Sequence, residues 1–212
     1  MDPKLYFSPG ACSLVSHIAL AESGAKYETS KVDFAAKENR SEAYREIHPQ
    51  GKVPALVTDK GTITENVAIL GWIGDHYGKP GSVPVKDKHD RAKATELLGW
   101  CASTVHISFG MIFRPLRFAA GNKKAAQTAG QKRLSVHFAR MEEMAAGDGW
   151  LVGKEFSAAD SYFAVFFRWA KRIGADVSRY PNWAAHVERV IARKAVAKAI
   201  KDEGLELDEF RL

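Results

Sequence analysis

The chain has 212 residues, of which 46% are hydrophobic, and this is enough apolar sequence for one large or two small globular domains rather than a disordered chain. Its formal charge of +6 comes from 31 basic and 25 acidic residues that alternate along most of the chain, which predicts solvated helix faces rather than a nucleic-acid interface. We see no signal-peptide pattern, no run of about 18 apolar residues and only two cysteines, far apart, so we expect a cytoplasmic protein that binds neither membrane nor nucleic acid.

The chain begins with the signals of a strand, a turn and a helix. Residues 5–7 are predicted to form a short buried strand, closed by the turn at 8–10. Apolar residues then recur with helical spacing over 14–19, and Gly24 is a typical helix stop. A second strand is predicted over 27–32. The polar segment that follows has no clear assignment.

A hairpin and a further helix complete the first part of the chain. Two β-rich runs, at 55–58 and 62–64, flank a short turn that contains Gly61. In the helix that follows, the apolar residues up to Tyr77 share one face. The order β-α-β and then β-β-α is typical of a thioredoxin-like domain, which we expect to span residues 1–78.

The second part of the chain is predicted to be helical throughout. Residues 79–87 are rich in Gly and Pro and are predicted to be a linker, and residues 88–212 contain no strand pattern. Ser157 and Asp160 form a capping-box pattern at the start of a helix that is apolar on nearly every face. Pro181 lies where the next helix begins. The predicted fold class is therefore an α/β thioredoxin-like N-terminal domain followed by an all-α helical bundle.

Cys12 is the first candidate for chemistry. It lies between a turn and a helix, where free backbone N–H groups and the positive end of the helix dipole favour an anion. In such a position the pKa of a cysteine can fall from about 8.5 to roughly 3.5 to 7.5, which makes the thiolate a nucleophile at neutral pH. Taken alone, a cysteine is more often a small buried hydrophobe, and we interpret Cys101 in that way.

Two further segments could bind an extended peptide ligand. A cis bond between Val53 and Pro54 would turn the Val53 amide and carbonyl outward toward such a ligand, although only about 5% of X-Pro bonds are cis. At the start of the next helix, Asn66 can bind a carboxylate through its backbone and side chain, and Glu65 can pair with an ammonium group. Taken alone, that position is more often a simple helix cap.

The motifs occur together in the order of a known family. They are Ser-Pro-Gly-Ala-Cys-Ser-Leu at 8–14, Gly-x-Val-Pro at 51–54, Glu-Asn-Val-Ala-Ile-Leu at 65–70, and the capped helix at 157–169. Over nearly its full length the chain resembles bacterial beta-class glutathione S-transferases, and Pro-Gly-Ala-Cys-Ser separates this class from relatives that use Tyr or Ser. The resemblance implies glutathione as cosubstrate and a symmetric homodimer. No metal is expected, because Cys12 and His17 are potential ligands but no further pair has the spacing of a zinc site.

The resemblance also implies which residues surround glutathione. Cys12 would lie beside the glutathione sulfur, and His106 would face the cleft between the domains as a second catalytic group. Without the family, a lone histidine on a helix is more often structural. The remaining implied glutathione-binding residues are Lys37, Val53, Pro54, Glu65, Asn66, Ser103 and Thr104. Asn66 stands where the family usually has Ser or Gly, and Thr104 where some members have an acid.

The leading predicted activity is conjugation of glutathione to small apolar electrophiles, in detoxification. Cys12 would also allow thiol-disulfide exchange, since a thiolate attacks disulfides directly. Phe109, Met111 and Phe113 are expected to form apolar walls of the second substrate's site. The alternatives are a non-catalytic module that binds glutathione or apolar ligands, and a glutathione-dependent isomerase or dehalogenase on the same fold.

Overall fold

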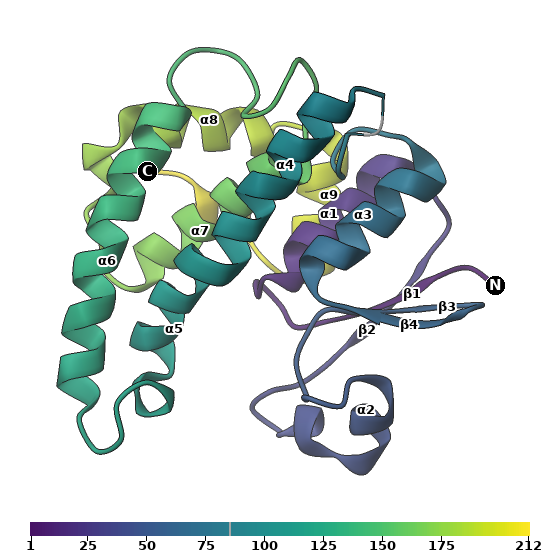
Figure 1. The fold of residues 1–212 in the computed structure, drawn as a ribbon, viewed down its shortest axis with the longest axis horizontal. Helices are drawn as coiled ribbons and strands as arrows, with labels where there is room; N and C mark the ends of the chain where they lie inside the picture. The colour runs from purple at the N-terminus through teal and green to yellow at the C-terminus, as the bar shows by residue number, and fades with distance from the viewer. Residues whose placement is uncertain (85) are drawn as a thin grey trace.

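The computed structural model describes residues 1–84 and 86–212, and it combines a small mixed sheet with a larger set of helices (Figure 1). The four strands are β1 (Lys4–Phe7), β2 (Glu28–Lys31), β3 (Ala55–Thr58) and β4 (Gly61–Thr64). They lie in the order β2-β1-β3-β4, with β1 parallel to β2 and with β3 antiparallel to β1 and β4. The strands and the hairpin are those that the sequence predicts.

Helices cover both faces of the sheet. In this first part of the chain the helices are α1 (Ser13–Ser23), the 3-10 helix η1 (Glu38–Arg40), α2 (Glu42–Ile47) and α3 (Asn66–Tyr77). α1 and α3 lie side by side on one face, while α2 lies on the opposite side (Figure 1). α1 ends at Gly24, whose φ of 68° is in the left-handed region that favours glycine. The segment without a predicted structure forms η1 and α2, and Ser41 caps α2 by accepting the Tyr44 N–H.

The second part of the chain is a helical bundle. Its helices are α4 (Lys88–Trp100), the π-helical segment η2 (Cys101–Val105), α5 (His106–Phe113), α6 (Lys123–Met144), α7 (Ala158–Arg172), α8 (Pro181–Ile191) and α9 (Lys194–Asp202), with short 3-10 turns η3 (Pro115–Arg117), η4 (Val177–Arg179) and η5 (Leu207–Phe210). No strand follows β4 in the described part of the chain. The predicted linker, residues 79–87, includes Val85, which lies outside the described residues, and the predicted domain limits stay predictions.

α7 runs through the centre of the bundle, as its apolar sequence predicts. Every residue from Ala158 to Ala170 is buried. The predicted capping box is confirmed, because the Asp160 carboxylate accepts both the N–H and the hydroxyl of Ser157, at 2.8 and 2.9 Å. The same carboxylate also accepts the Leu151 N–H and lies 3.0 Å from the His186 ring. The start of this buried helix is therefore held by several polar contacts of one carboxylate.

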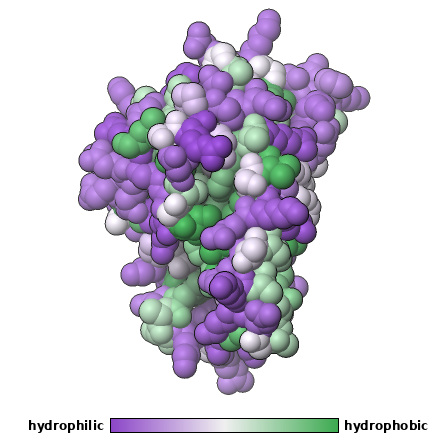
Figure 2. All heavy atoms as spheres, turned by 90° about the vertical axis from the view of Figure 1, so that its left-hand side faces the viewer, coloured by the Kyte–Doolittle hydropathy of each residue, from purple (hydrophilic) through white to green (hydrophobic). Residues whose placement is uncertain are grey.

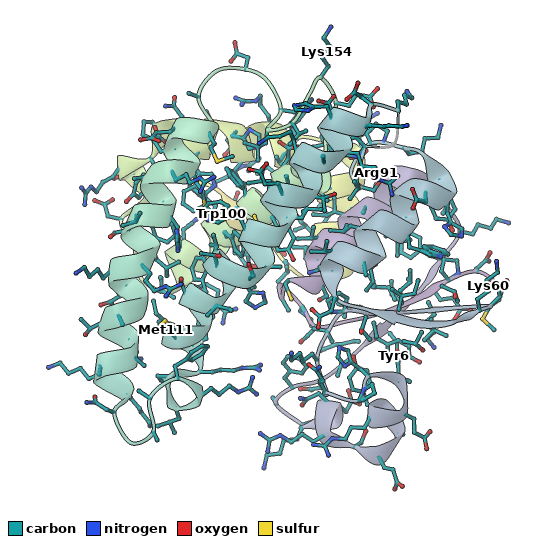
Figure 3. All side chains as sticks on the ribbon, in the orientation of Figure 1. Tyr6, Lys60, Arg91, Trp100, Met111 and Lys154 are labelled. Atoms are coloured by element: carbon teal, nitrogen blue, oxygen red, sulfur yellow. The ribbon has the colours of Figure 1, made fainter. Side chains whose placement is uncertain are left out.

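The two parts of the chain pack against each other along α1 and α3. α1 contacts α7 and α9, and α3 contacts α4. At the edge of this contact, Arg91 of α4 extends toward α3 (Figure 3) and donates two hydrogen bonds, of 2.6 and 3.0 Å, to the Asp75 carboxylate. Such an exposed ion pair contributes only about 0–1 kcal/mol, so the apolar packing along α1 provides most of the attachment.

The continuous helix Lys88–Phe113 is, within the described residues, the one helix long and apolar enough to cross a membrane. The core helix of a soluble protein passes the same test, and α5 packs closely on α6 while α4 packs on α7. The face on which α6 lies is mostly hydrophilic, with apolar side chains gathered along its middle (Figure 2). The absence of a membrane partner therefore stays a prediction.

Candidate active site

The start of α1 positions Cys12. The chain turns at residues 8–10, and Cys12 occupies the position directly before the first helical residue, Ser13. The Cys12 side chain is 9% exposed. Its thiol donates a hydrogen bond to the Val53 carbonyl, with 3.5 Å between Sγ and the oxygen. The structure thus brings two of the predicted site residues, Cys12 and Val53, into contact.

The predicted lowering of the Cys12 pKa is wrong for the protein in this structure. Burial raises the pKa of the Cys12 thiol to about 12, because a thiolate would lose its hydration. The backbone N–H groups of Cys12 and Ser13 and the charge of Arg114 favour the thiolate, whereas the nearby Glu65 carboxylate opposes it. The helix start acts in the predicted direction, but burial has the larger effect, and Cys12 is a hydrogen-bond donor.

Helices of the bundle hold the turn that precedes Cys12. The Gly10 N–H donates to the buried Glu203 carboxylate at 2.8 Å, and the Gly10 carbonyl accepts the Trp169 indole N–H at 2.8 Å. Arg168 also donates to this carbonyl, at 3.3 Å. Gly10 has a φ of 64°, and a side chain there would collide with the Arg168 guanidinium. The position of Cys12 therefore depends on contacts from residues more than 150 positions later in the chain.

The segment before β3 presents its backbone to Cys12. The Val53–Pro54 bond is cis, which is the conformation that the sequence analysis considered for an outward-facing Val53 backbone. The Val53 carbonyl accepts the Cys12 thiol, while the Val53 N–H makes no hydrogen bond to any described residue. The preceding carbonyl, of Lys52, is held by the Tyr44 hydroxyl at 2.6 Å. The free N–H of Val53, beside the Cys12 sulfur, is where a peptide could pair.

Glu65 and Asn66, at the start of α3, differ in orientation. Glu65 is exposed and has a φ of 67°, a strained conformation that costs a residue with a side chain about 1–3 kcal/mol and is common at functional sites. Asn66 is buried: its Oδ1 accepts the Ser16 hydroxyl at 2.6 Å, and its Nδ2 donates to the Cys12 carbonyl and the Tyr162 hydroxyl, at 2.8 and 2.9 Å.

The prediction that the Asn66 side chain caps the helix or binds a carboxylate is therefore wrong. All the polar atoms of this side chain are used in contacts to α1 and α7, and Glu65 rather than Asn66 occupies the position before the helix. The Asn66 N–H remains open among the described residues, as expected for the first turn of a helix. An anion at this position would meet backbone N–H groups only.

The predicted segment Ser103–His106 spans the end of the π-helical turn Cys101–Val105 and the first residue of α5. π-turns are rare and frequently occur at functional sites. The Ser103 hydroxyl is exposed and donates to the Gly99 carbonyl at 2.8 Å, and the half-buried Thr104 accepts the Ser108 hydroxyl at its carbonyl, at 2.9 Å. Neither side chain hydrogen bonds to Cys12 or Val53 in the described part of the chain.

His106 begins α5 and packs against the bundle. Its ring lies edge-on to Trp169, with 5.1 Å between the ring centroids. Burial lowers the pKa of His106 to about 4, and the charges of Arg114 and Lys52 act in the same direction. His106 is therefore neutral at pH 7 and has a nitrogen lone pair that can accept a proton or a hydrogen bond.

Arg114 is a residue that the sequence interpretation missed. It follows α5 directly, and its guanidinium lies 5.4 Å from the centroid of the Phe34 ring, so it links the bundle to the loop after β2. Its charge favours the Cys12 thiolate and opposes protonation of His106. Pro115, which cannot continue a helix, was the available sequence signal for a helix end at Arg114.

Lys37 and Phe109 were also predicted to lie at the site, and the structure places neither beside Cys12. Lys37 is exposed, with a φ of 61°, and no interaction among the described residues links it to Cys12 or His106. Phe109 was predicted to line a substrate site, but it is 0% exposed and its ring lies in the core against Phe113, Phe166 and Trp169. In the described residues, no group of three or more His, Cys, Asp or Glu side chains could hold a metal ion.

Comparison with known proteins identifies the family of the chain. The glutathione S-transferase N-terminal domain matches residues 1–75, and the glutathione S-transferase C-terminal domain matches residues 100–194. Glutathione S-transferase GstA of Escherichia coli O157:H7 is 32% identical over 204 residues, which are 95% of this chain and 99% of that protein. Glutathione S-transferase GST-4.5 of Xanthomonas campestris is 31% identical with the same coverage.

Solved structures give the same result at the level of the fold. A sphingomonad glutathione S-transferase complexed with glutathione is 38% identical, with a TM-score of 0.83, over 96% of this chain and 100% of that one. A beta-class glutathione S-transferase of Sphingomonas chungbukensis is 36% identical, with the same score and coverage. The two matched family models cover the thioredoxin-like part of the chain and most of the helical bundle. This chain belongs to the glutathione S-transferase family, and its relatives include the bacterial beta class.

Proposed function

We propose that the protein conjugates glutathione to small electrophiles in the cytoplasm, as a homodimer and in detoxification. The observation that carries this proposal is the contact between the Cys12 thiol and the Val53 carbonyl, at 3.5 Å, beside a Val53 N–H without a partner among the described residues. A cysteinyl residue of a tripeptide that paired with Val53 would bring its own sulfur next to Cys12.

The other charged groups of glutathione have matching partners at the start of α3. The exposed Glu65 carboxylate can pair with the glutathione ammonium group, and the open N–H of Asn66 can bind the neighbouring carboxylate at the positive end of the helix. Lys37 is a candidate for the second carboxylate, and Ser103 and Thr104 complete the proposed site on the opposite side. A solved relative complexed with glutathione supports glutathione as the ligand.

The raised pKa of Cys12 favours conjugation over the formation of a mixed disulfide. A protonated Cys12 can donate a hydrogen bond to the glutathione thiolate, which stabilises the nucleophile. The glutathione sulfur then attacks the electrophilic carbon and forms a C–S bond while the leaving group departs with its electron pair. We assign the neutral His106 as the group that accepts the proton of the glutathione thiol.

A comparison of two activities tests this proposal. Conjugation to 1-chloro-2,4-dinitrobenzene and reduction of hydroxyethyl disulfide are measured for wild-type protein, Cys12→Ala, Cys12→Ser and the control Cys101→Ser. We expect Cys12→Ala to lower conjugation by about tenfold to a hundredfold, in line with the loss of one hydrogen-bond donor to a reacting anion, and Cys12→Ser to retain more activity. No turnover by wild-type protein, with glutathione bound, would favour a binding module instead.

An isomerase is the second candidate, because one relative supports it. A protein named probable maleylacetoacetate isomerase 1, from Drosophila melanogaster, is 29% identical over 85% of this chain and 74% of that protein. Isomerisation uses glutathione without consuming it, whereas conjugation consumes one glutathione for each product. The amount of free thiol during turnover therefore distinguishes the two activities.

A further inference from the structure

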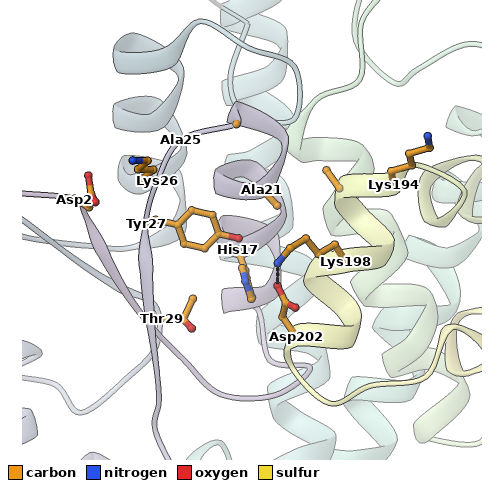
Figure 4. A pocket seen from close by; sticks show the side chains of 12 residues that line it. Asp2, His17, Ala21, Ala25, Lys26, Tyr27, Thr29, Lys194, Lys198 and Asp202 are labelled. Atoms are coloured by element: carbon orange, nitrogen blue, oxygen red, sulfur yellow. Dashed lines mark hydrogen bonds and ion pairs between the residues drawn. The ribbon is translucent and has the colours of Figure 1, made fainter.

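The second substrate of the proposed reaction has to lie beside the glutathione sulfur, near Cys12 and His106. A cavity of about 680 Å³ between α1, β2 and α9 (Figure 4) is not this place, because its lining residues come from 2–29 and 194–202 and include neither Cys12 nor His106. The end of α5 is better placed, since His106 begins that helix and Arg114 directly follows it. The side chains there indicate which kind of electrophile binds.

Large apolar side chains are exposed at the end of α5. Phe113, Leu116 and Phe118 lie within six positions and are 43%, 56% and 44% exposed. Apolar side chains that are exposed singly need no explanation, whereas a group of them indicates a binding surface. The Phe113 ring lies edge-on to Trp169, with 5.7 Å between the ring centroids, and Trp169 in turn contacts the His106 ring. Phe113 can therefore pack on an aromatic electrophile one ring away from the proposed proton acceptor.

Arg114 has no acid partner in the described part of the chain. Its exposed guanidinium makes no ion pair and no hydrogen bond there, and it lies 5.4 Å from the centroid of the Phe34 ring. The carboxylate of Asp33, the residue before Phe34, instead accepts the N–H groups of Ala35 and Ala36, at 2.8 and 3.0 Å. A guanidinium with its N–H groups unused can bind a carboxylate through two parallel hydrogen bonds.

The fixed charges that act on Arg114 are positive. Partial burial and the charges of Arg117 and Arg40 lower the pKa of Arg114. Cations that gather in this way attract an anion, because it relieves their mutual repulsion. The proposed function already assigns the two carboxylates of glutathione, to the Asn66 N–H and to Lys37. The anion at Arg114 therefore has another source, and the second substrate is the molecule that lies there.

We propose, on the basis of the proposed conjugation, that the electrophile is an aromatic compound with a carboxylate group. The carboxylate pairs with Arg114, the ring packs on Phe113, and the electrophilic carbon lies beside the glutathione sulfur. For an aryl halide, the sulfur forms a bond to that carbon, the halide leaves with the electron pair of the carbon–halogen bond, and the thiol proton goes to His106. Arg114 thus determines which electrophile is preferred.

The test compares two electrophiles of nearly the same shape, 4-chloro-3,5-dinitrobenzoate and 4-chloro-3,5-dinitrobenzamide, of which only the first is an anion. Each kcat/KM is divided by the rate constant of the uncatalysed reaction of the same compound with glutathione, which removes differences in intrinsic reactivity. We expect the wild-type protein to prefer the carboxylate by at least about tenfold, as for hydrogen bonds between charged groups. Equal normalised values would overturn the proposal.

Variants of one arginine locate the preference. Arg114→Gln should reduce it to less than about twofold, and Arg114→Lys, which keeps the charge but loses the planar guanidinium, should retain part of it. Arg179→Gln is the matched control, because Arg179 is an exposed arginine at the end of η4 without an ion pair in the described part of the chain. It should leave the preference unchanged. Circular dichroism checks that each variant is folded. If Arg114→Gln raised the KM for glutathione and lowered both normalised values equally, Arg114 would bind glutathione itself, which contradicts the proposal.

Binding of the two products separates this proposal from the proposed function. The glutathione conjugates of both compounds are titrated into wild-type protein and Arg114→Gln by calorimetry, which requires no turnover. We expect the carboxylate conjugate to bind about tenfold more tightly than the amide conjugate, in wild-type protein only. That result in a protein without turnover would reject the conjugation but keep the carboxylate site at Arg114. Equal affinity for the two conjugates would overturn the carboxylate site, whether or not the protein conjugates glutathione.

Discussion

At the scale of single residues, the environment of Cys12 determines its chemistry more than its position in the sequence. The sequence places a thiol at a helix start, which favours the thiolate. The folded chain encloses that thiol against the Val53 carbonyl, and burial raises its pKa to about 12. The result is a thiol that donates a hydrogen bond to the Val53 carbonyl.

The raised pKa of Cys12 predicts slow alkylation. At pH 7 the thiolate fraction should be about a thousand times smaller than for a cysteine with the ordinary pKa of 9.0. In a Cys101→Ser background, the rate of reaction with iodoacetamide should therefore be low at pH 7 and should still increase above pH 10. A rate that levels off below pH 8 would show that the helix start outweighs burial after all.

Because the pKa of His106 is about 4, the dependence of kcat on pH should show no change near pH 6.5, where an ordinary histidine titrates. If His106 accepts the proton of glutathione, kcat should stay constant on the acid side down to about pH 5, since the imidazole remains neutral there. His106→Asn should lower kcat by about a hundredfold. His76→Asn, at an exposed position of α3, serves as the matched control and should leave kcat unchanged.

At the scale of the elements, Asn66 connects three helices through one buried side chain. Asn66 is the first residue of α3. Its side chain hydrogen bonds to Ser16 in α1, to Cys12 directly before α1, and to Tyr162 in α7. A buried amide with this many partners has a structural role, because removal of the amide leaves its partners unsatisfied.

Asn66→Ala should therefore destabilise the fold. The loss of hydrogen bonds to Ser16, Cys12 and Tyr162 should lower the free energy of unfolding by about 2–4 kcal/mol, measured by urea denaturation. Glu65→Ala, one position earlier and exposed, should change stability little but weaken glutathione binding. If Asn66→Ala weakened glutathione binding without loss of stability, the side chain would have the ligand role that its orientation contradicts.

At the scale of the whole molecule, the bundle holds the turn that precedes Cys12. The Gly10 N–H donates a hydrogen bond to the Glu203 carboxylate, and the Gly10 carbonyl accepts hydrogen bonds from Trp169 and Arg168. The thioredoxin-like part therefore depends on α7 and the end of α9 for the geometry of its own site. Unfolding of the bundle should release Cys12 from its buried position.

A pair of glycine substitutions tests this dependence. Gly10 and Gly24 have similar φ angles, 64° and 68°, but a side chain would meet Arg168 at Gly10 and nothing within 4 Å at Gly24. Gly10→Ala should therefore destabilise the protein by about 1–3 kcal/mol more than Gly24→Ala, because only Gly10 adds overpacking to the backbone strain. Equal losses of stability in thermal denaturation would mean that the contact with the bundle is loose.

By itself, the sequence determined the elements and their order. Local patterns are sufficient for the strand, turn and helix around Cys12, for the hairpin after Pro54, and for the capping box of α7, because each depends on residues a few positions apart. Motif order was sufficient for the family. The tertiary structure alone decided that Cys12 is a buried donor, that Asn66 points inward and that Arg114 reaches the site, because these properties depend on burial and charge from residues distant in the chain.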